Sequence, residues 1–351
     1  MAVVIVNSHM MAAVLYGKEH LQVEPVAVPT IQSGDILVRV RVALTCGTDV
    51  KVFRRGYHAR MIVPPAVFGH ELAGDVVAVG EGVTRFRAGQ RVVAANSAPC
   101  EACYFCRRGL QNLCEDLLFN NGAYAEYIRI PARIVERNTY EIPAGVGYRD
   151  AALVEPLACV ARGFEETAPR QGDSMAIIGL GPIGLMFVKL AKLRGCRVIA
   201  VGRRRPQLDR AASLGADELI VGSEGADPVK AIRDMTHGRG VDVAIEAVGK
   251  PLTWQWAVNS VRRGGTVNFF GGCPNDSKVN LDTALLHYSE ITCKASFHHT
   301  PEYVRKAMDL VCAGHITASV FVNSEEPLAN LLEVMRHLMS HNGHLKTAIV
   351  P

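Results

Sequence analysis

The chain has 351 residues, of which 49% are hydrophobic and 21% charged, and its formal net charge is +4. These values are ordinary for a globular protein and argue against a disordered, collagenous or coiled-coil chain. The small positive excess gives little reason to expect a nucleic-acid partner, and no apolar run reaches the roughly 18 residues that a membrane helix needs. The length predicts about two domains, and we expect neither nucleic acid nor a membrane as partner.

The first residues are apolar, but no basic segment precedes them and no small-residue cleavage site follows, unlike a secretion signal. The run Asn7-Ser8-His9-Met10 looks like a junction introduced with an expression vector. We therefore expect residues 1–10 to be a vector-derived or flexible leader and assign no function to them.

Residues 11–150 contain short β-type segments separated by turns. Strands are predicted at Ile36–Val42, which alternates partly with a period of two, at Leu72–Val79 and at Gln90–Ala95. Prolines 64 and 65 and the glycines at 80 and 82 mark turns. Short strands at this spacing predict a barrel-like β domain.

The pattern changes after about residue 165, where strands and helices begin to alternate. The predicted strands are Met175–Ile178, Arg197–Val201, Glu218–Val221, Val241–Ala247, Thr266–Phe270 and a last one near Glu290–Phe297. The predicted helices are Pro182–Arg194, Pro206–Leu214, Pro228–Thr236, Leu252–Val261 and Asp282–Tyr288. Regular alternation predicts a doubly wound parallel sheet, and mixed structure returns after about residue 300.

A glycine motif joins the first strand of this region to its first helix. It reads Gly179-Leu180-Gly181-Pro182-Ile183-Gly184. The glycines permit a tight turn, close approach of a pyrophosphate and close packing of helix on strand, and the helix N-terminus favours negative charge. This position predicts dinucleotide binding by Gly179, Gly181, Pro182, Ile183 and Gly184 rather than a turn without a ligand.

The end of the second strand indicates which dinucleotide binds. An acidic residue there would hold the ribose 2′-hydroxyl of NAD, but this chain has Gly202-Arg203-Arg204-Arg205. Arginine binds a 2′-phosphate through a two-pronged fork. We expect NADP, held by Gly202, Arg203, Arg204 and Arg205; the alternative is a solvated basic loop.

Four of the ten cysteines form a cluster with metal-ligand spacing. Cys100, Cys103, Cys106 and Cys114 offer four thiolates to a closed, tetrahedral structural zinc site. Two disulfides are a less favoured alternative because no secretion signal precedes them. A nucleic-acid-binding zinc module is disfavoured because the segment is short and only locally basic.

A looser group combines Cys46 with His70 and Glu71. Cys46 ends a predicted strand, and the His-Glu pair directly precedes another. One cysteine, one histidine and one or two carboxylates suit a catalytic zinc, which keeps a position open for substrate. Taken alone these residues also fit ordinary packed side chains, and the dinucleotide motif and the four-cysteine segment favour the zinc interpretation.

From about Met11 to its C-terminus the chain resembles the zinc-containing medium-chain alcohol and polyol dehydrogenases, in particular the sorbitol-dehydrogenase-like branch. The ordered motifs that carry this resemblance are Cys-Gly-Thr-Asp at 46–49, Gly-His-Glu at 69–71, the four cysteines, Gly-Ala-Tyr-Ala-Glu-Tyr at 122–127, Glu155-Pro156-Leu157, the glycine motif and Leu214-Gly215-Ala216-Asp217.

The resemblance implies a GroES-like β-barrel catalytic domain, residues 11–164 and 299–351, with a structural zinc lobe at 96–116. It implies a Rossmann domain over 165–298. The implied ligands of the catalytic zinc are Cys46, His70, Glu71 and Glu155, the last directly or through water. Two zinc ions per chain are expected, together with a cytoplasmic homodimer or homotetramer.

The resemblance also implies that zinc polarises the substrate oxygen while a hydride passes to or from the nicotinamide. Thr48 stands where the family starts its proton relay, and Lys51 stands where many members have a relay histidine. His298 and His299 occupy a region where sorbitol-type members use an arginine. This departure favours another polyol, a cyclitol, a sugar, a hydroxyketone or a secondary alcohol as substrate. The alternative is that both histidines lie at a domain edge and contact no substrate.

Two other functions remain open at this point. One is a zinc-free quinone or enoyl reductase of the same superfamily, which needs no metal ligands. The other is a noncatalytic NADP-binding or zinc-binding interaction protein that kept the fold. The candidates for every catalytic role favour the dehydrogenase.

Overall fold

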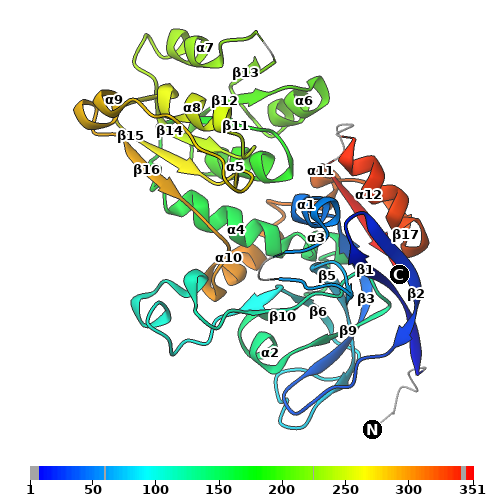
Figure 1. The fold of residues 1–351 in the computed structure, drawn as a ribbon. Coiled ribbons are helices and arrows are strands. Elements are labelled where there is room, and N and C mark those ends of the chain that lie inside the picture. The colour runs from blue at the N-terminus through cyan, green and yellow to red at the C-terminus, as the bar shows by residue number, and fades with distance from the viewer. Residues whose placement is uncertain (1–7, 59–60, 224, 341–344) are drawn as a thin grey trace. The chain divides into compact units, whose positions relative to one another are not determined.

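The computed structural model describes residues 8–58, 61–223, 225–340 and 345–351. The chain forms two compact units, the first made of the residues up to Ala158 together with His299–Pro351, the second of Cys159–His298 (Figure 1). Of the expected leader, residues 1–7 lie outside the described residues, whereas His9 and Met10 belong to a strand. Within the described ranges, no helix has both the length and the apolar character needed to cross a membrane.

The first unit is mainly antiparallel β structure. Its larger sheet has the strand order β10-β6-β5-β3-β18-β17, with β9 also paired to β3, and a smaller sheet has the order β2-β1-β4. Its strands are β1 His9–Gly17, β2 His20–Ala27, β3 Ile36–Leu44, β4 Ala66–Val67, β5 Glu71–Val79, β6 Arg91–Ala94, β7 Ser97–Ala98, β8 Leu118–Phe119, β9 Tyr127–Ile130, β10 Thr139–Glu141, β17 Val322–Pro327 and β18 Lys346–Val350.

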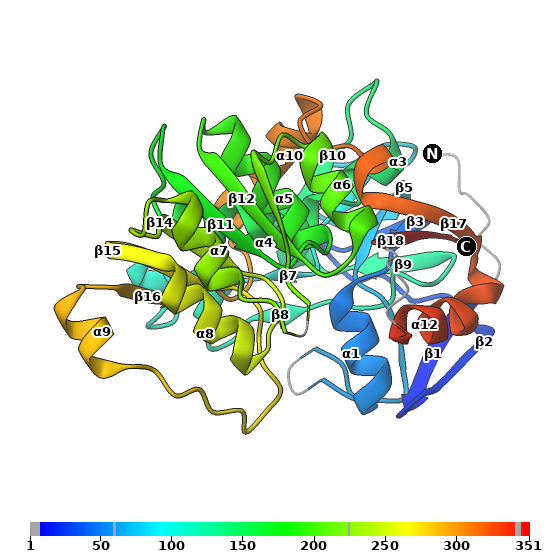
Figure 2. The ribbon, with the colours of Figure 1, turned by 90° about the horizontal axis from the view of Figure 1, so that it is seen from above.

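Helices cover parts of these sheets. They are α1 Gly47–Arg55, α2 Ala132–Asn138, α3 Tyr148–Ala151, α10 Pro301–Cys312, α11 Ala318–Phe321 and α12 Leu331–Met339, with short 3-10 turns at η1 Cys106–Arg108, η2 Gln111–Leu113 and η3 Leu328–Asn330. Helix α4, Val154–Glu165, spans the boundary between the units. In both ribbon views α1 lies beside α12 (Figures 1 and 2). A helix from the N-terminal part of the chain and one from the C-terminal part therefore share one hydrophobic core.

The second unit confirms the predicted parallel sheet. All its strand pairs are parallel, in the order β13-β12-β11-β14-β15-β16. The strands are β11 Ser174–Ile178, β12 Arg197–Gly202, β13 Glu218–Val221, β14 Val241–Glu246, β15 Val261–Phe269 and β16 Thr292–Ala295. The helices are α5 Pro182–Leu193, α6 Arg205–Ser213, α7 Pro228–Met235, α8 Pro251–Ser260 and α9 Thr283–Tyr288.

Helix α5 packs on one face of this sheet, and α7 and α8 pack together on the other (Figure 1). The buried cluster on that second face joins strand residues such as Ile178 and Val201 to Ile232 of α7 and Val258 of α8. Strand order reverses between β11 and β14, which makes the end of β11 the switch point where such sheets bind ligands.

The predicted strands and helices coincide with the observed ones within a few residues. The largest differences are in β15, which starts five residues earlier than predicted, and in β16, which is shorter at both ends. Pairing to β15 covers only Thr292–Ala295, and the flanking Glu290 and His298 have φ values of 49° and 67°, outside extended geometry. Left-handed backbone at these two residues interrupts the extended conformation, so the strand is shorter than predicted.

Candidate functional site

The pairing of β3 with β5 brings the predicted cysteine and histidine together. Leu44, the last residue of β3, is the register partner of Glu71, the first residue of β5. Cys46 therefore follows one strand at the point where His70 precedes the other. The Cys46 sulfur, a His70 ring nitrogen and a Glu71 oxygen all lie within 4.8 Å of one another.

Asp49 orients both Cys46 and His70. Cys46 caps the N-terminus of α1, and its backbone N–H donates to Asp49 Oδ2 at 3.1 Å. The other oxygen, Oδ1, lies 2.9 Å from His70 Nδ1, and the Tyr124 hydroxyl donates to Oδ2 at 2.6 Å. With Nδ1 held by a carboxylate, Nε2 is the imidazole nitrogen left for a metal.

Gly69 fits this arrangement because the Tyr124 ring packs directly against it. Its φ is +91°, and a Cβ there would come within 2.6 Å of Tyr124 Cδ2. Tyr124 itself is fully buried, with an exposed fraction of 0%. Because Gly69 has no side chain, the Tyr124 ring can pack against it and place its hydroxyl on Asp49.

Glu71 is held by a buried lysine from the last strand. Lys346 Nζ lies 2.7 Å from Glu71 Oε1 and 2.5 Å from Oε2, and it donates to the Thr45 carbonyl at 3.0 Å. Burial alone would lower the pKa of Lys346, but the nearby anionic groups Glu71, Cys46 and Glu155 together outweigh this and raise it above its ordinary value. Glu71 therefore already has a cationic partner on both oxygens.

The chemistry of the group fits a zinc ion. Burial by itself would lower the pKa of His70, but Asp49 and Cys46 raise it well above its usual value, so the two groups favour a cation at the imidazole. Thiolate and imidazole are preferred zinc ligands. Cys46 and His70 offer both, and Glu71 adds a carboxylate shared with Lys346.

The other predicted residues of this region lie in different settings. Glu155 is outside the three-residue group; burial raises its pKa to about 7, and its Oε1 lies 3.7 Å from His299 Nε2. His299 is buried and also lies 3.2 Å from Asn96 Oδ1. Thr48 is half-buried in the first turn of α1, and Lys51 is exposed on that helix.

His298 belongs to the second unit, and its neighbourhood there is a partly buried polar network. Arg162 Nη1 donates to the His298 carbonyl at 3.0 Å and to the Phe297 carbonyl at 2.7 Å. Its Nη2 donates to Glu166 Oε1 at 2.6 Å. The backbone of His298 is thereby fixed, although the residue adopts a φ of 67°.

The four clustered cysteines converge as a metal site would require. The sulfurs of Cys100, Cys103, Cys106 and Cys114 all lie within 4.8 Å of one another, and none of the ten cysteines, all of them in the described ranges, is in a disulfide. Backbone amides of Glu115 and Cys106 lower the pKa of Cys103 to about 6, whereas burial raises that of Cys106 to about 12. A zinc ion among them would stabilise four thiolates that otherwise repel one another.

The glycine motif forms an open cradle at the end of β11. Gly179 has a φ of +100°, and a Cβ at Gly184 would come within 1.7 Å of the Gly179 carbonyl oxygen. At Gly181 a Cβ would meet nothing within 4 Å, and no side chain caps the N-terminus of α5 at Gly181 and Pro182. The open space at Gly181 and the uncapped backbone N–H groups of Ile183 and Gly184 suit a pyrophosphate.

Arginines follow β12, and within the described residues no carboxylate pairs with Arg203 or Arg204. Burial and the neighbouring Arg203 lower the pKa of Arg204, whereas Arg205 is paired with Asp209 at 2.8 Å. A Cβ at Gly202 would come within 2.7 Å of Leu180 Cδ1, so the strand end packs tightly on the glycine turn. The positive charges of Arg203 and Arg204, close together and without a carboxylate partner among the described residues, suit an anionic ligand.

Sequence reasoning assigned no role to Asp49, Tyr124 or Lys346. Asp49 lies in the motif at 46–49, and Tyr124 lies in the motif at 122–127. The position of Asp49, a carboxylate three residues after the candidate ligand Cys46, was the signal that could have indicated an orienting role. Lys346 gave no local signal, because only the pairing of β18 with β3 brings it to the site.

Comparison with known proteins agrees with this arrangement. The profile of the alcohol dehydrogenase GroES-like domain matches residues 32–142, and that of the zinc-binding dehydrogenases matches residues 182–313. Sorbitol dehydrogenase of Bacillus subtilis is 32% identical over 99% of this chain and 98% of its own length. L-threonine 3-dehydrogenase of Bacillus licheniformis is 35% identical over 72% of this chain and 73% of its own.

Among solved structures, a protein from Sinorhizobium meliloti 1021 described as a zinc-binding dehydrogenase, and bound to NADP, matches with a TM-score of 0.91. It is 30% identical and the match covers 98% of this chain and 100% of that one. The fold class is thus confirmed as a GroES-like domain with a Rossmann-type parallel sheet. The chain belongs to the family of zinc-binding alcohol dehydrogenases.

Proposed function

We propose that the chain transfers a hydride between NADP(H) and a small polar alcohol, such as a polyol, cyclitol, sugar or other secondary alcohol, or the matching ketone. Cys46, His70 and Glu71 would hold a catalytic zinc, and Glu155 would complete the shell directly or through water. Cys100, Cys103, Cys106 and Cys114 would hold a structural zinc. The names of the relatives, sorbitol dehydrogenase and L-threonine 3-dehydrogenase, support a hydroxyl-bearing polar substrate.

The observation that carries this proposal is the convergence of Cys46, His70 and Glu71 around an orienting carboxylate, Asp49. When bound there, zinc supplies Lewis-acid chemistry, which lowers the pKa of an alcohol oxygen. Asp49 keeps the His70 proton on Nδ1, so that Nε2 presents its lone pair to the site. The Tyr124 hydroxyl and the Cys46 N–H fix Asp49 in turn.

Thr48 would accept the alcohol proton. It lies in the first turn of α1, two residues after Cys46, and is half-buried. A hydroxyl both donates and accepts, so Thr48 can take a proton from substrate while passing its own onward.

The cofactor would be held by residues of the second unit. The cradle formed by Gly179, Gly181 and Gly184 would take the pyrophosphate, and the guanidinium groups of Arg203 and Arg204 would take the 2′-phosphate. NADP in the Sinorhizobium meliloti structure supports this choice. Bound NADP supplies the carbon that accepts or gives the hydride.

Initial rates at the NADPH absorbance band test the proposal. NADP and NAD should each be offered with vicinal diols, cyclitols and secondary alcohols. We expect turnover with NADP on at least one diol or secondary alcohol. Faster turnover with NAD would contradict the arginine assignment, and silence over the whole panel from zinc-loaded protein would contradict the substrate class.

A matched pair of cysteine variants separates the dehydrogenase from the other functions. Cys46→Ser should abolish turnover and keep NADP binding, whereas Cys312→Ser, at an exposed cysteine, should leave both unchanged. An active Cys46→Ser enzyme would favour the zinc-free reductase. A wild-type protein that binds NADP and zinc but turns over neither alcohols nor ketones would favour the interaction protein.

We further propose a homodimer or homotetramer in the cytoplasm, where a reducing environment keeps thiol ligands free. The four cysteines without a disulfide support the compartment. Light scattering of the purified protein tests the assembly, since a monomer would contradict it. Fractionation of the producing cells tests the compartment.

A further inference from the structure

A polar pocket lies at the edge of the parallel sheet opposite the glycine motif. Ser174 and Arg197 are the first residues of β11 and β12, and Asp242 is the second residue of β14. The glycine motif follows the other end of β11. Because parallel strands start at one edge and end at the other, this pocket is separate from the proposed NADP site.

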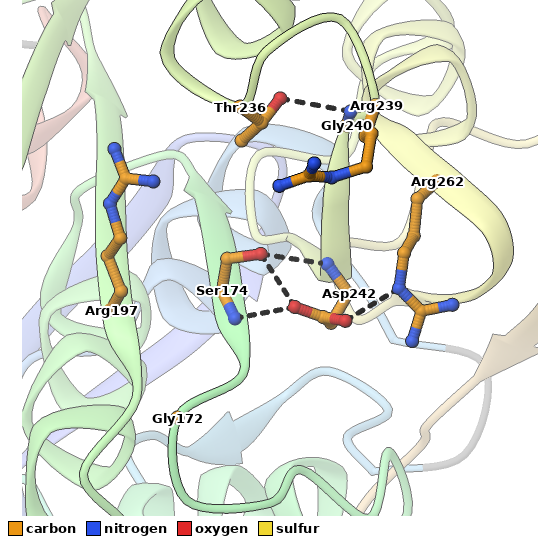
Figure 3. A pocket seen from close by; sticks show the side chains of 8 residues that line it. All are labelled: Gly172, Ser174, Arg197, Thr236, Arg239, Gly240, Asp242 and Arg262. Atoms are coloured by element: carbon orange, nitrogen blue, oxygen red, sulfur yellow. Dashed lines mark hydrogen bonds and ion pairs between the residues drawn. The ribbon is translucent and has the colours of Figure 1, made fainter.

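The pocket has a volume of about 290 Å³, enough for an inorganic anion or a small organic one. Three of its lining residues are arginines and one is an aspartate. The lining is Gly172, Ser174, Arg197, Thr236, Arg239, Gly240, Asp242 and Arg262 (Figure 3). The charge of the lining is therefore positive.

The single carboxylate of this lining is already occupied by donors. Asp242 Oδ2 accepts from the Ser174 N–H and hydroxyl, each at 2.7 Å, and Oδ1 accepts from Arg262 Nε at 2.6 Å (Figure 3). Because both of its oxygens already accept hydrogen bonds, Asp242 is not available as a ligand for a cation. The pocket is thus built for an anion.

Two of the arginines are held in place by carboxylates and still have N–H groups to offer. Arg197 uses Nε and Nη2 on Glu218 and the Met235 carbonyl, which leaves Nη1 without a partner among the described residues. Arg262 uses Nε and Nη1, which leaves Nη2 in the same position within the described part of the chain. Fixed donors of this kind lower the ordering cost of binding an anion.

Arg239 provides the uncompensated charge. Its guanidinium has no hydrogen-bond or ion-pair partner among residues 8–58, 61–223, 225–340 and 345–351. Figure 3 shows it extending from its loop into the pocket, on the side of Ser174 and Thr236. The backbone at Gly240 is tied down by its N–H, which donates to Thr236 Oγ1 at 2.9 Å, so the loop that presents Arg239 is anchored.

A second hollow, lined in part by the same Arg239 and Arg262, adjoins the pocket. Its volume is about 630 Å³, and it adds Arg263 with the apolar side chains of Val261 and Leu285. Mixed polar and apolar walls beside an anion pocket provide room for the organic part of a phosphate ester.

We propose that this pocket binds a small phosphate-bearing anion, with the phosphate between Arg197, Arg239 and Arg262. Planar guanidinium groups bind phosphate oxygens through paired N–H donors. The site is independent of the proposed dehydrogenase reaction and of its cofactor. The ligand is either free phosphate or a phosphate monoester whose carbon skeleton reaches the adjoining hollow.

Calorimetric titration of the zinc-loaded enzyme, kept saturated with NADP, tests this site. The probes are inorganic phosphate and phenyl phosphate, a monoester without a hydroxyl that the dehydrogenase could oxidise. The test variant is Arg239→Met, which removes an exposed arginine that supports no contact in the described structure. The control is Arg87→Met, which removes another exposed arginine, in the first unit.

We expect saturable binding that Arg239→Met weakens about tenfold or more, the scale of one lost charge-assisted contact, while Arg87→Met leaves it unchanged. Tighter binding of phenyl phosphate identifies the ester as the ligand class, and equal affinities identify free phosphate. Equal affinities of wild type and Arg239→Met would overturn the site, as would the absence of saturable binding by wild type. The further variant Arg203→Gln should leave this binding unchanged, which separates the pocket from the cofactor site.

Discussion

Lys346 and Glu71 form an ion pair in which neither side chain reaches solvent, with exposed fractions of 3% and 0% and a shortest N–O distance of 2.5 Å. The pair lies beside the Cys46 and His70 ligands, so it decides how free Glu71 is to approach a metal. Breaking such a pair from one side leaves a buried charge without compensation.

Replacement of Lys346 by methionine should therefore lower the free energy of unfolding by about 3–5 kcal/mol in metal-free protein. Urea denaturation of wild type and variant measures this. In the double variant Lys346→Met with Glu71→Gln most of the loss should be recovered, because no buried charge remains. A single variant as stable as wild type would show that the pair contributes nothing.

Substitution of Asp49 by asparagine should weaken zinc binding at the Cys46 site about 10–100-fold, the usual effect of removing an orienting carboxylate. Asparagine keeps the size of the side chain but holds the His70 proton less firmly. Competition with a chromogenic chelator gives the affinity. Tyr124→Phe removes only the hydroxyl that donates to Asp49 and should have a smaller effect in the same direction; unaltered zinc affinity in both variants would contradict the orienting role.

Serine at Cys103 should reduce the zinc content by one ion per chain, because a closed structural site needs all four ligands. Loop folding and metal binding are coupled, so limited proteolysis should then cut within residues 96–116. Elemental analysis and mass spectrometry of the fragments report both effects. Cys312→Ser is the matched control and should keep full zinc; a Cys103→Ser protein with full zinc and an uncut lobe would refute the four-cysteine site.

The double variant Arg203→Gln with Arg204→Gln should raise KM for NADP about tenfold or more and leave KM for NAD nearly unchanged. Each charged hydrogen bond to a phosphate contributes about 1.5–3 kcal/mol, and about 1.4 kcal/mol is a factor of ten. Gly202 is left intact because any Cβ there would approach Leu180. Equal changes for both cofactors would indicate damage to the strand end instead of a lost phosphate contact.

Stability in acid should depend on Asp242. Burial by itself would raise its pKa, but hydrogen bonds from Ser174 and Arg262 outweigh this and hold it below the ordinary value. A carboxyl whose folded pKa is lowered contributes stability that is full above its unfolded pKa, near 4, and is lost as the pH falls through the folded pKa.

Asp242→Asn should thus be less stable than wild type at neutral pH, by about 1–2 kcal/mol for this partly exposed group. The difference should shrink as the pH falls below about 4. Urea denaturation between neutral and acidic pH, in buffers without phosphate, measures both. A difference that grows on acidification would show the opposite sign of linkage.

Local patterns sufficed for much of this molecule. Alternation of strands and helices predicted the parallel sheet, because most elements there contact their neighbours in the chain. The glycine motif predicted the cradle since its function depends on backbone geometry within six residues. The four cysteines 100, 103, 106 and 114 lie within one short segment. Their small separation along the chain keeps the four sulfurs close together.

The surroundings of the candidate metal ligands were decided by tertiary structure alone. Tyr124 reaches Asp49 because it packs on Gly69, and Lys346 reaches Glu71 because β18 pairs with β3. Arg197, Arg239 and Arg262 meet at one pocket because three separate strands begin at one sheet edge. Sequence patterns report the periodicity of single elements, whereas partners far apart along the chain are chosen by strand register and close packing, which no local pattern contains.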